Sequence, residues 1–166
     1  MEERIIEFMI EDNDNDKLID LSLKDFSFQT ASESPAPGGG SISAYCGAMG
    51  AALATMVANL SANKRGWDDR WQEFSQWAEK GLEFQEKLLL LVDEDTNAFN
   101  AILNANRLPS KDKAEHAIKE KAIKKANELA FETPYRIACL CSEVVNLCVD
   151  LSINGNPSSI SDVGVA

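Results

Sequence analysis

The residues of this chain best suited to chemistry are three acids in the stretch LLVDEDTNAF, residues 90–99. On a helix with about 100° between successive residues, Asp95 falls on the same arc as the apolar Val92. Asp93 and Glu94 are expected to point away from that arc, toward water. A carboxylate among apolar side chains costs free energy unless it is paired or protonated, and such groups are common where a reaction moves protons. Asp95 is therefore a proton-transfer residue, part of a structural ion pair, or a helix position that lies at a cleft.

A glycine-rich segment, SPAPGGGS at residues 34–41, is the second candidate. Glycines ahead of a helix expose backbone N–H groups, and the helix dipole favours negative charge at that end. The segment lacks the Gly-Lys-Ser/Thr signature of a phosphate-binding loop, and no strand precedes it. It is either a hinge between two helices or a corner that binds an anion or a carbonyl group.

A basic pair, Lys64 and Arg65, follows the apolar stretch that begins at the glycines. The pair suits a ligand that carries a carboxylate, although solvated surface positions are the ordinary state of such side chains. Together these features define the candidate ligand-binding residues. They are Pro37, Gly38, Gly39, Gly40, Ser41, Lys64 and Arg65.

The cysteines give little support for a metal site. Cys46, Cys139, Cys141 and Cys148 form no Cys-x-x-Cys pair, and the single histidine, His116, is far from them in sequence. We expect buried, reduced thiols and no zinc site.

The first two elements that must position these residues are long helices. Residues 42–60 are rich in Ala and Gly and carry no charge, which favours a helix surrounded by protein over a membrane span. A second helical pattern covers residues 68–104, with a break in its apolar stripe near Gln85. The stripe consists of Trp71, Phe74, Ala78, Leu82, Leu88, Val92, Phe99 and Ile102.

The remaining periodic segments are also helical. Residues 111–130 have a thin apolar stripe, and an apolar helix then continues to the NGNP stop at residues 154–157. Between them, Thr133 and Pro134 mark either the start of a new helix or a kink in one continuous helix. No segment alternates with period two, so the chain is predicted to be an all-α, multihelical up-and-down bundle.

Composition restricts the partners. The 166 residues carry 27 acids against 16 basic residues, a net charge of −11, which disfavours nucleic acid and anionic membranes. The N-terminal MEERIIEFMI is acidic where a signal peptide would be basic, which predicts a cytoplasmic protein. We expect an N-terminal segment and acidic linker over residues 1–17 and a helical domain over 18–166. That domain is expected to be truncated, because the apolar run at its C-terminus does not complete a helix.

The motifs SPAPGGGS, LVDEDTNAF and NGNP followed by SDVGV together resemble the cyclodeaminase family. This family comprises the C-terminal part of formiminotransferase-cyclodeaminase and the free-standing methenyltetrahydrofolate cyclohydrolases. The resemblance extends from about Leu18 over nearly the whole chain. It implies a helical bundle that forms a homodimer or higher oligomer, with folate in a cleft. Family members continue past SDVGV into a further helix.

The resemblance also implies an activity. It is that of an ammonia-lyase of histidine degradation, which converts 5-formimidoyltetrahydrofolate to 5,10-methenyltetrahydrofolate and ammonia. Asp95 matches the catalytic second acid of the family's Asp-x-Asp pair. The resemblance implies that the folate, with or without a polyglutamate tail, is the substrate. It implies no cofactor. The segment ERIIEFMI resembles the junction after a formiminotransferase, which implies a fused or associated transferase. The alternatives are a methenyltetrahydrofolate cyclohydrolase and a non-catalytic helical assembly module.

Overall fold

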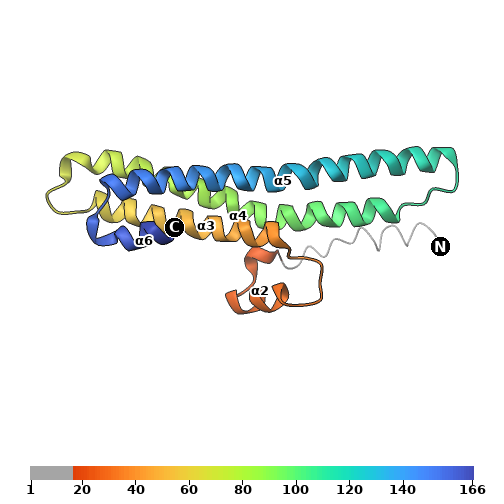
Figure 1. Ribbon diagram of the computed structural model, residues 1–166, viewed down its shortest axis with the longest axis horizontal. Helices are drawn as coiled ribbons and strands as arrows, with labels where there is room; N and C mark the ends of the chain where they lie inside the picture. The colour runs from red at the N-terminus through yellow and green to blue at the C-terminus, as the bar shows by residue number, and fades with distance from the viewer. Residues whose placement is uncertain (1–16) are drawn as a thin grey trace.

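The computed structural model describes residues 17–166, and this part of the chain contains helices and no strand. The three long helices are α3 (Gly39–Ala62), α4 (Trp71–Arg107) and α5 (Lys113–Asn154). Each runs antiparallel to the one before it, along the long axis of the molecule (Figure 1). The short elements are η1 (Leu18–Asp20), α2 (Leu23–Thr30), η2 (Asp68–Arg70), η3 (Pro157–Ser159) and α6 (Ile160–Val165). The predicted all-α up-and-down bundle is confirmed. The predicted N-terminal segment, residues 1–17, lies outside the described residues except for its last one.

Helix α3 is the core helix that its composition predicts, and it contacts α4, α5 and α6. Its buried face is built from alanines that are at most 1% exposed: Ala44, Ala48, Ala51, Ala54 and Ala58. A glycine on α4 completes the close approach, because a Cβ at Gly81 would lie 3.4 Å from the Ala51 carbonyl oxygen and would overlap the Thr55 hydroxyl. Small side chains on both helices therefore bring the backbones of α3 and α4 together.

The apolar stripe predicted for α4 is correct in part; three of its residues are exposed, among them Phe99 at 37%. Phe74, Leu88 and Val92 are buried as expected, but Trp71 is 54% exposed and Leu82 is 47% exposed. The buried face instead passes from Ala78 through Gly81 and Phe84 to Leu88, which spans the break near Gln85. The periodicity favoured a large leucine where the packing requires a glycine.

The structure settles the alternatives at Thr133 and Pro134. The two residues lie inside one continuous helix, α5, and do not begin a new one. Thr133 is buried, and its hydroxyl donates to the Leu129 carbonyl at 3.0 Å. Pro134 is exposed and has no backbone N–H, so the hydrogen bond that an α-helix would direct to the Ala130 carbonyl cannot form.

Helices α3 and α5 are both long and apolar enough to span a membrane by length and composition alone. In α3, 44% of the most apolar window is buried by neighbouring helices, which is the position of a bundle core helix. Length and composition are weak evidence for a span in such a case.

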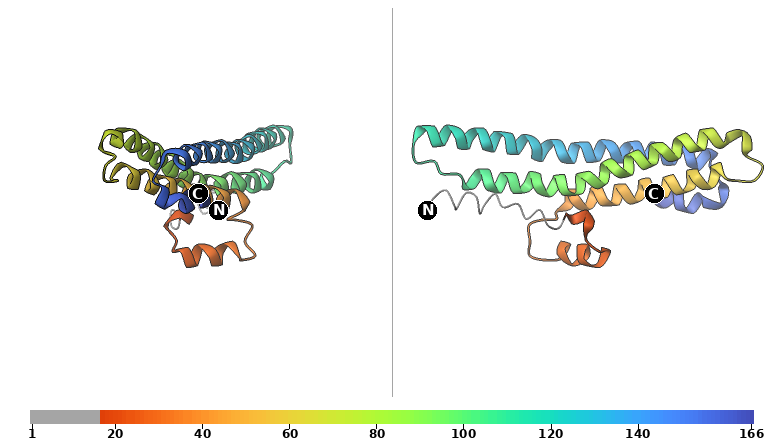
Figure 2. Two further views of the ribbon diagram at one scale, coloured as in Figure 1. Left: turned by 60° about the vertical axis from the view of Figure 1, so that its left-hand side comes forward. Right: turned by 180° about the vertical axis from the view of Figure 1, so that it is seen from behind.

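A small N-terminal layer covers the start of α3. Seen from the end and from behind, α2 stands beside the three long helices rather than among them (Figure 2). Ser22 caps α2 by accepting the Asp25 N–H at 3.1 Å, and Phe26 packs against Tyr45 of α3 with ring centroids 5.4 Å apart. This layer leads into the loop of residues 31–38, which brings the glycines to α4.

Candidate active site

The carboxylate of Asp95, on α4, meets the N-terminus of α3. Its Oδ2 accepts the backbone N–H of Ser41 at 2.9 Å and lies 3.2 Å from the Ser41 hydroxyl. Ser41 is the third residue of α3, where backbone N–H groups have no partner within the helix. The N-cap residue, Gly38, has no side chain to supply one. Asp95 therefore caps α3 from another helix, where the helix dipole also favours its negative charge.

Gly40 is the residue that admits this carboxylate. A Cβ built on Gly40 would overlap the carboxyl group of Asp95, lying only 2.6 Å from Oδ2, the most distant of its three carboxyl atoms. A Cβ on the neighbouring Gly39 would meet nothing within 4 Å. The glycine triplet thus has a purpose that the sequence did not suggest: at Gly40 it makes room for an acid of the same chain.

Ser41 holds the acid from behind. It is 0% exposed, and its hydroxyl donates to the Val92 carbonyl of α4 at 2.8 Å. The hydroxyl of Thr96 lies 3.2 Å from the Ser41 hydroxyl, so Ser41 sits in a short polar chain between α3 and α4. The hydroxyl has a single hydrogen, which serves either Val92 or Asp95 at one time. The Ser41 backbone N–H is consequently the constant partner of the carboxylate.

A cavity of about 300 Å³ lies beside Asp95. It is lined by Pro35, Ala36, Gly38, Gly39, Asp95, Thr96, Ala98, Phe99, Ile102 and Ala130. Oδ1 of Asp95 accepts no hydrogen bond from the described residues and is not buried, so this oxygen remains accessible. The N–H groups of Gly39 and Gly40 likewise donate to no described residue. The site combines a fixed carboxylate, free backbone donors and apolar walls.

The other two acids of the group serve different neighbours. Asp93 was expected to face water, but its Oδ1 accepts the Leu18 N–H at 2.7 Å and its Oδ2 is buried without a partner among the described residues. That expectation was wrong because η1 covers this side of α4, which periodicity within α4 does not show. Glu94 pairs with Arg136 of α5 at 2.6 Å on the surface, as an outward-facing acid should. Three successive acids thus bind three different elements.

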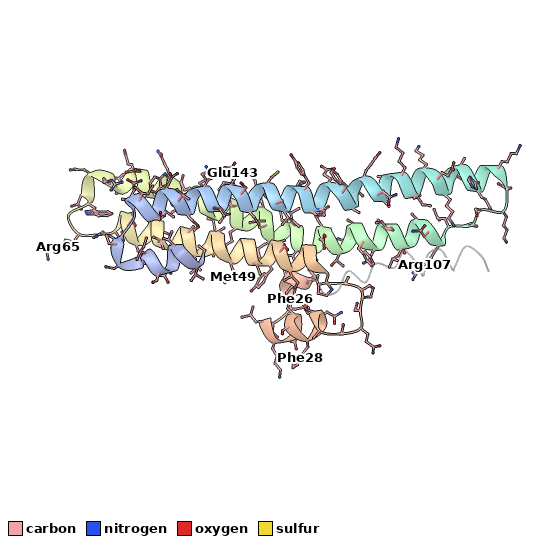
Figure 3. All side chains as sticks on the ribbon, viewed as in Figure 1. Phe26, Phe28, Met49, Arg65, Arg107 and Glu143 are labelled. Atoms are coloured by element: carbon pink, nitrogen blue, oxygen red, sulfur yellow. The ribbon has the colours of Figure 1, made fainter. Side chains whose placement is uncertain are left out.

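Lys64 and Arg65 lie at the opposite end of α3. The 24 residues of this helix extend about 36 Å at 1.5 Å per residue. The Lys64 ammonium sits 4.0 Å above the Trp67 ring, and Arg65 projects from the tip of the bundle (Figure 3). Within one chain the structure does not bring this pair to Asp95, and its contact with a ligand stays a prediction.

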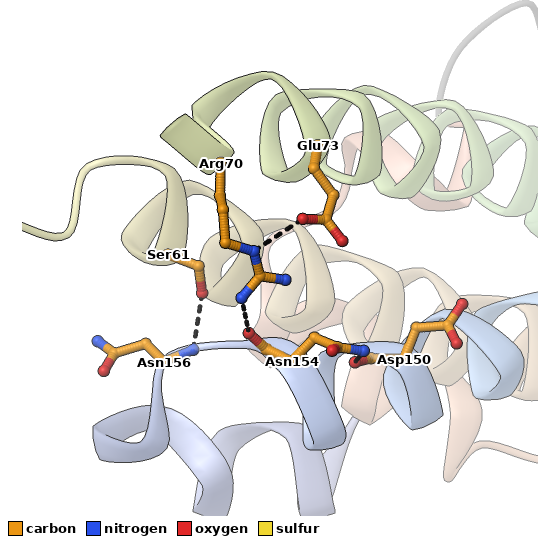
Figure 4. Close-up of polar contacts among 6 residues, drawn as sticks. All are labelled: Ser61, Arg70, Glu73, Asp150, Asn154 and Asn156. Carbon is orange, nitrogen blue, oxygen red and sulfur yellow. Dashed lines mark hydrogen bonds and ion pairs between the residues drawn. The ribbon is translucent and has the colours of Figure 1, made fainter. Parts of the chain in front are cut away.

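Polar groups at this tip are occupied by structural bonds (Figure 4). Arg70 donates to Glu73 at 2.9 Å and to the Asn154 carbonyl at 3.3 Å. The Ser61 hydroxyl donates to the Val57 carbonyl at 2.7 Å and accepts the Asn156 N–H at 2.8 Å. This network joins the ends of α3, α4 and α5 and leaves little capacity for a ligand.

The thiols depart in part from expectation. All four cysteines are free, but only Cys148 is buried; Cys141 is half-buried, whereas Cys46 and Cys139 are exposed. Burial raises the pKa of Cys141 and of Cys148 above the ordinary value. Among residues 17–166, no group of three His, Cys, Asp or Glu side chains is arranged to hold a metal.

Of the predicted ligand-binding residues, Gly38 and Gly39 line the cavity, while Pro37, Gly40 and Ser41 do not. The lining residues Ala98, Phe99 and Ile102 follow Asp95 at helical spacings of three, four and seven, so the sequence held a signal for them. Ala130 comes from another helix and was missed. The sequence signal for Ala130 was Pro134, four residues later, because a proline inside a helix cannot donate to the carbonyl four residues before it.

Three comparisons relate the chain to known proteins. A family model described as formiminotransferase-cyclodeaminase matches residues 22–166. The methenyltetrahydrofolate cyclohydrolase of Methylorubrum extorquens is 34% identical over 145 residues, which cover 87% of this chain and 70% of that protein. The formimidoyltransferase-cyclodeaminase of Mus musculus is 33% identical over 165 residues, or 99% of this chain. The chain spans only 30% of that longer relative.

A solved structure agrees with the fold. The crystal structure of a formiminotetrahydrofolate cyclodeaminase from Thermotoga maritima superposes with a TM-score of 0.76 at 29% identity. The match covers 89% of this chain and 69% of that one.

Proposed function

The chain belongs to the formiminotransferase-cyclodeaminase family of folate one-carbon metabolism, and we propose that it is a formimidoyltetrahydrofolate cyclodeaminase. This ammonia-lyase would convert 5-formimidoyltetrahydrofolate to 5,10-methenyltetrahydrofolate with release of ammonia. The observation that carries the proposal is Asp95, which lines the cavity and whose Oδ2 is held by the Ser41 N–H, while Oδ1 accepts no hydrogen bond from the described residues. A cavity of about 300 Å³ is at the lower end of small-molecule sites. It would hold the reacting ring system, with the remainder of the folate outside.

The proposed chemistry needs one group that moves a proton over a short distance. N10 of the substrate attacks the carbon of the protonated formimidoyl group, a C–N bond forms as the C=N π electrons move to the exocyclic nitrogen, and N10 loses its proton to Oδ1 of Asp95. The same oxygen returns the proton to the exocyclic nitrogen, the C–N bond to that nitrogen breaks, and ammonia leaves. Because Oδ2 is fixed by the end of α3, the exchange is confined to the oxygen that faces the substrate. Ring closure within one molecule is favoured once the two nitrogen atoms are positioned.

Each part of this reaction is a proton transfer or a ring closure, so the proposal includes neither a metal nor a redox cofactor. The free N–H group of Gly39, which lines the cavity, would hold an acceptor atom of the ligand. The glycine corner thus keeps its predicted role in ligand binding. In this proposal a backbone N–H group binds the ligand, and the space left by the missing side chains does not.

A second candidate activity is that of a methenyltetrahydrofolate cyclohydrolase. The relative from Methylorubrum extorquens carries that name, and the match covers 70% of its length. Water would attack the methenyl carbon, and Asp95 would accept the proton of the water. The same carboxylate serves both reactions, so the site geometry alone does not separate them.

Assembly and partners are part of the same proposal. We propose a cytoplasmic homodimer, supported by Met49, Met56 and Leu60, which share one face of α3 and are 39–49% exposed. Lys64 and Arg65 would then reach a folate, with or without a polyglutamate tail, only through a second subunit. The longer relatives whose names join the two activities suggest a fused or associated formiminotransferase.

Asp95→Asn tests the proposal. The amide oxygen still accepts the Ser41 N–H, so α3 remains capped and the protein folds, but the side chain no longer moves protons. We expect turnover of 5-formimidoyltetrahydrofolate to fall about 10²–10⁴-fold, measured as ammonia release and as 5,10-methenyltetrahydrofolate formed. If the unchanged chain releases no ammonia but opens 5,10-methenyltetrahydrofolate, the cyclohydrolase is the correct activity. If the variant and the unchanged chain are equally active, Asp95 is not catalytic.

A further inference from the structure

Helix α5 contains one backbone carbonyl that its own helix does not use. Pro134 lies inside α5 and has no N–H, so it cannot donate to the carbonyl of Ala130. The hydroxyl of Thr133 does not replace this donor, because it bonds to the Leu129 carbonyl at 3.0 Å. The Ala130 oxygen therefore keeps its acceptor capacity in the middle of a 42-residue helix.

This position coincides with the candidate active site. Ala130 is the residue of α5 that lines the cavity beside Asp95. Packing does not account for the proline four residues later, because Pro134 is exposed and fills no part of the buried core. A proline inside a helix is destabilising, and here the bond that it removes belongs to a wall of the cavity. Ala130 lies on the α5 side of the cavity and Asp95 on the α4 side.

We propose that the Ala130 carbonyl accepts an N–H of the formimidoyl group and that Pro134 is a positioning residue that keeps this carbonyl vacant. The inference rests on the proposed function. A protonated formimidoyl nitrogen carries two N–H bonds, and Oδ1 of Asp95 satisfies only one of them. The carbonyl satisfies the second and holds the nitrogen as it becomes ammonia. A formyl group presents an oxygen at this place, which the carbonyl does not bind, so the pair selects the formimidoyl substrate.

Pro134→Ala tests this role without loss of the fold. Alanine restores an N–H that bonds to the Ala130 carbonyl and removes a helix breaker, so the melting temperature should rise by several degrees. We expect the KM for 5-formimidoyltetrahydrofolate to rise about tenfold, the loss of one hydrogen bond to a charged group. The inhibition constant of 5-formyltetrahydrofolate should not rise. Ser152→Ala, an exposed change near the C-terminal end of α5, is the matched control for greater helix stability. It should leave both constants unchanged.

Three results decide between the role of the carbonyl and simpler explanations. Weaker binding of both ligands by the Pro134 variant would mean that the helix has changed shape, and it would overturn the inference. Unchanged binding of both would overturn it as well. Failure of the unchanged chain to bind either folate would refute the proposed function itself. This outcome is measured on the unchanged chain alone, so it is distinguished from failure of the inference about Pro134.

Discussion

Two buried serines, Ser41 and Ser61, lie near opposite ends of α3, and both are 0% exposed. Ser61 donates to a carbonyl of its own helix at 2.7 Å and accepts the Asn156 N–H at 2.8 Å. The Ser41 hydroxyl donates to the Val92 carbonyl of α4 at 2.8 Å and lies 3.2 Å from Oδ2 of Asp95, whose Oδ1 accepts no hydrogen bond from residues 17–166. The two serines are equally buried in the same helix. Ser61 completes a hydrogen-bond network, whereas Ser41 belongs to a network in which an acceptor remains without a donor among the described residues.

The surroundings of the two serines explain the difference. At the Ser61 end, Trp67 stacks on Phe74 with centroids 5.6 Å apart, and Arg70 lies over the Phe74 ring at 4.6 Å. At the Ser41 end, a cavity of about 300 Å³ takes the place of such side chains. A buried polar group that is fully paired stabilises the fold, whereas one that retains acceptor capacity beside a cavity is available to a ligand. The two ends should therefore respond differently to the same substitution.

The largest effect is expected at Gly40. In Gly40→Ala the new methyl group occupies the place of the Asp95 carboxylate. The carboxylate must leave the end of α3, and we expect kcat/KM to fall at least about 100-fold, the scale of a lost general acid–base group. Steady-state turnover measures this, with Gly164→Ala as the matched control, because a Cβ there meets nothing within 4 Å. Wild-type turnover in Gly40→Ala would show that Asp95 does not act from this position.

The serine pair gives the next largest effect. Ser61→Ala leaves the Asn156 N–H without its acceptor, so the free energy of unfolding should fall by about 1–3 kcal/mol while turnover stays within twofold. Ser41→Ala keeps the backbone N–H that holds Asp95 but removes the hydroxyl behind it, so we expect turnover to fall about tenfold. Urea unfolding and steady-state turnover on both variants measure the contrast. Equal losses of activity in the two variants would refute the functional difference between the ends.

Sequence patterns identified the parts of this site that depend on one helix. Asp95 was found because its inward direction follows from the period of α4. The partner of Gly40, the cover over Asp93 and the contribution of Ala130 were not found, because each depends on which element packs against α4. The stripe failed at Leu82 for a related reason. Close contact with Ala51 selects a glycine at the neighbouring position, and hydrophobicity does not indicate such a contact.

The smallest effect is expected in the middle of α3. This part of the helix should be closely packed, whereas a cavity lies beside its N-terminal end. A Cβ at Gly47 would lie 2.6 Å from the Cys141 sulfur, so α5 packs closely there. Burial raises the pKa of Cys141 and Cys148, so at any pH below the raised values a smaller fraction of these thiols is the reactive thiolate. At pH 8, iodoacetamide should label the exposed Cys46 and Cys139 first. The difference in labelling rate between the exposed cysteines and Cys141 or Cys148 should decrease as the pH rises, because a larger fraction of Cys141 and Cys148 is then thiolate. Peptide mass spectrometry over time measures the order, and equal labelling of Cys141 and Cys46 at pH 8 would show that α5 does not pack closely on α3 at Gly47.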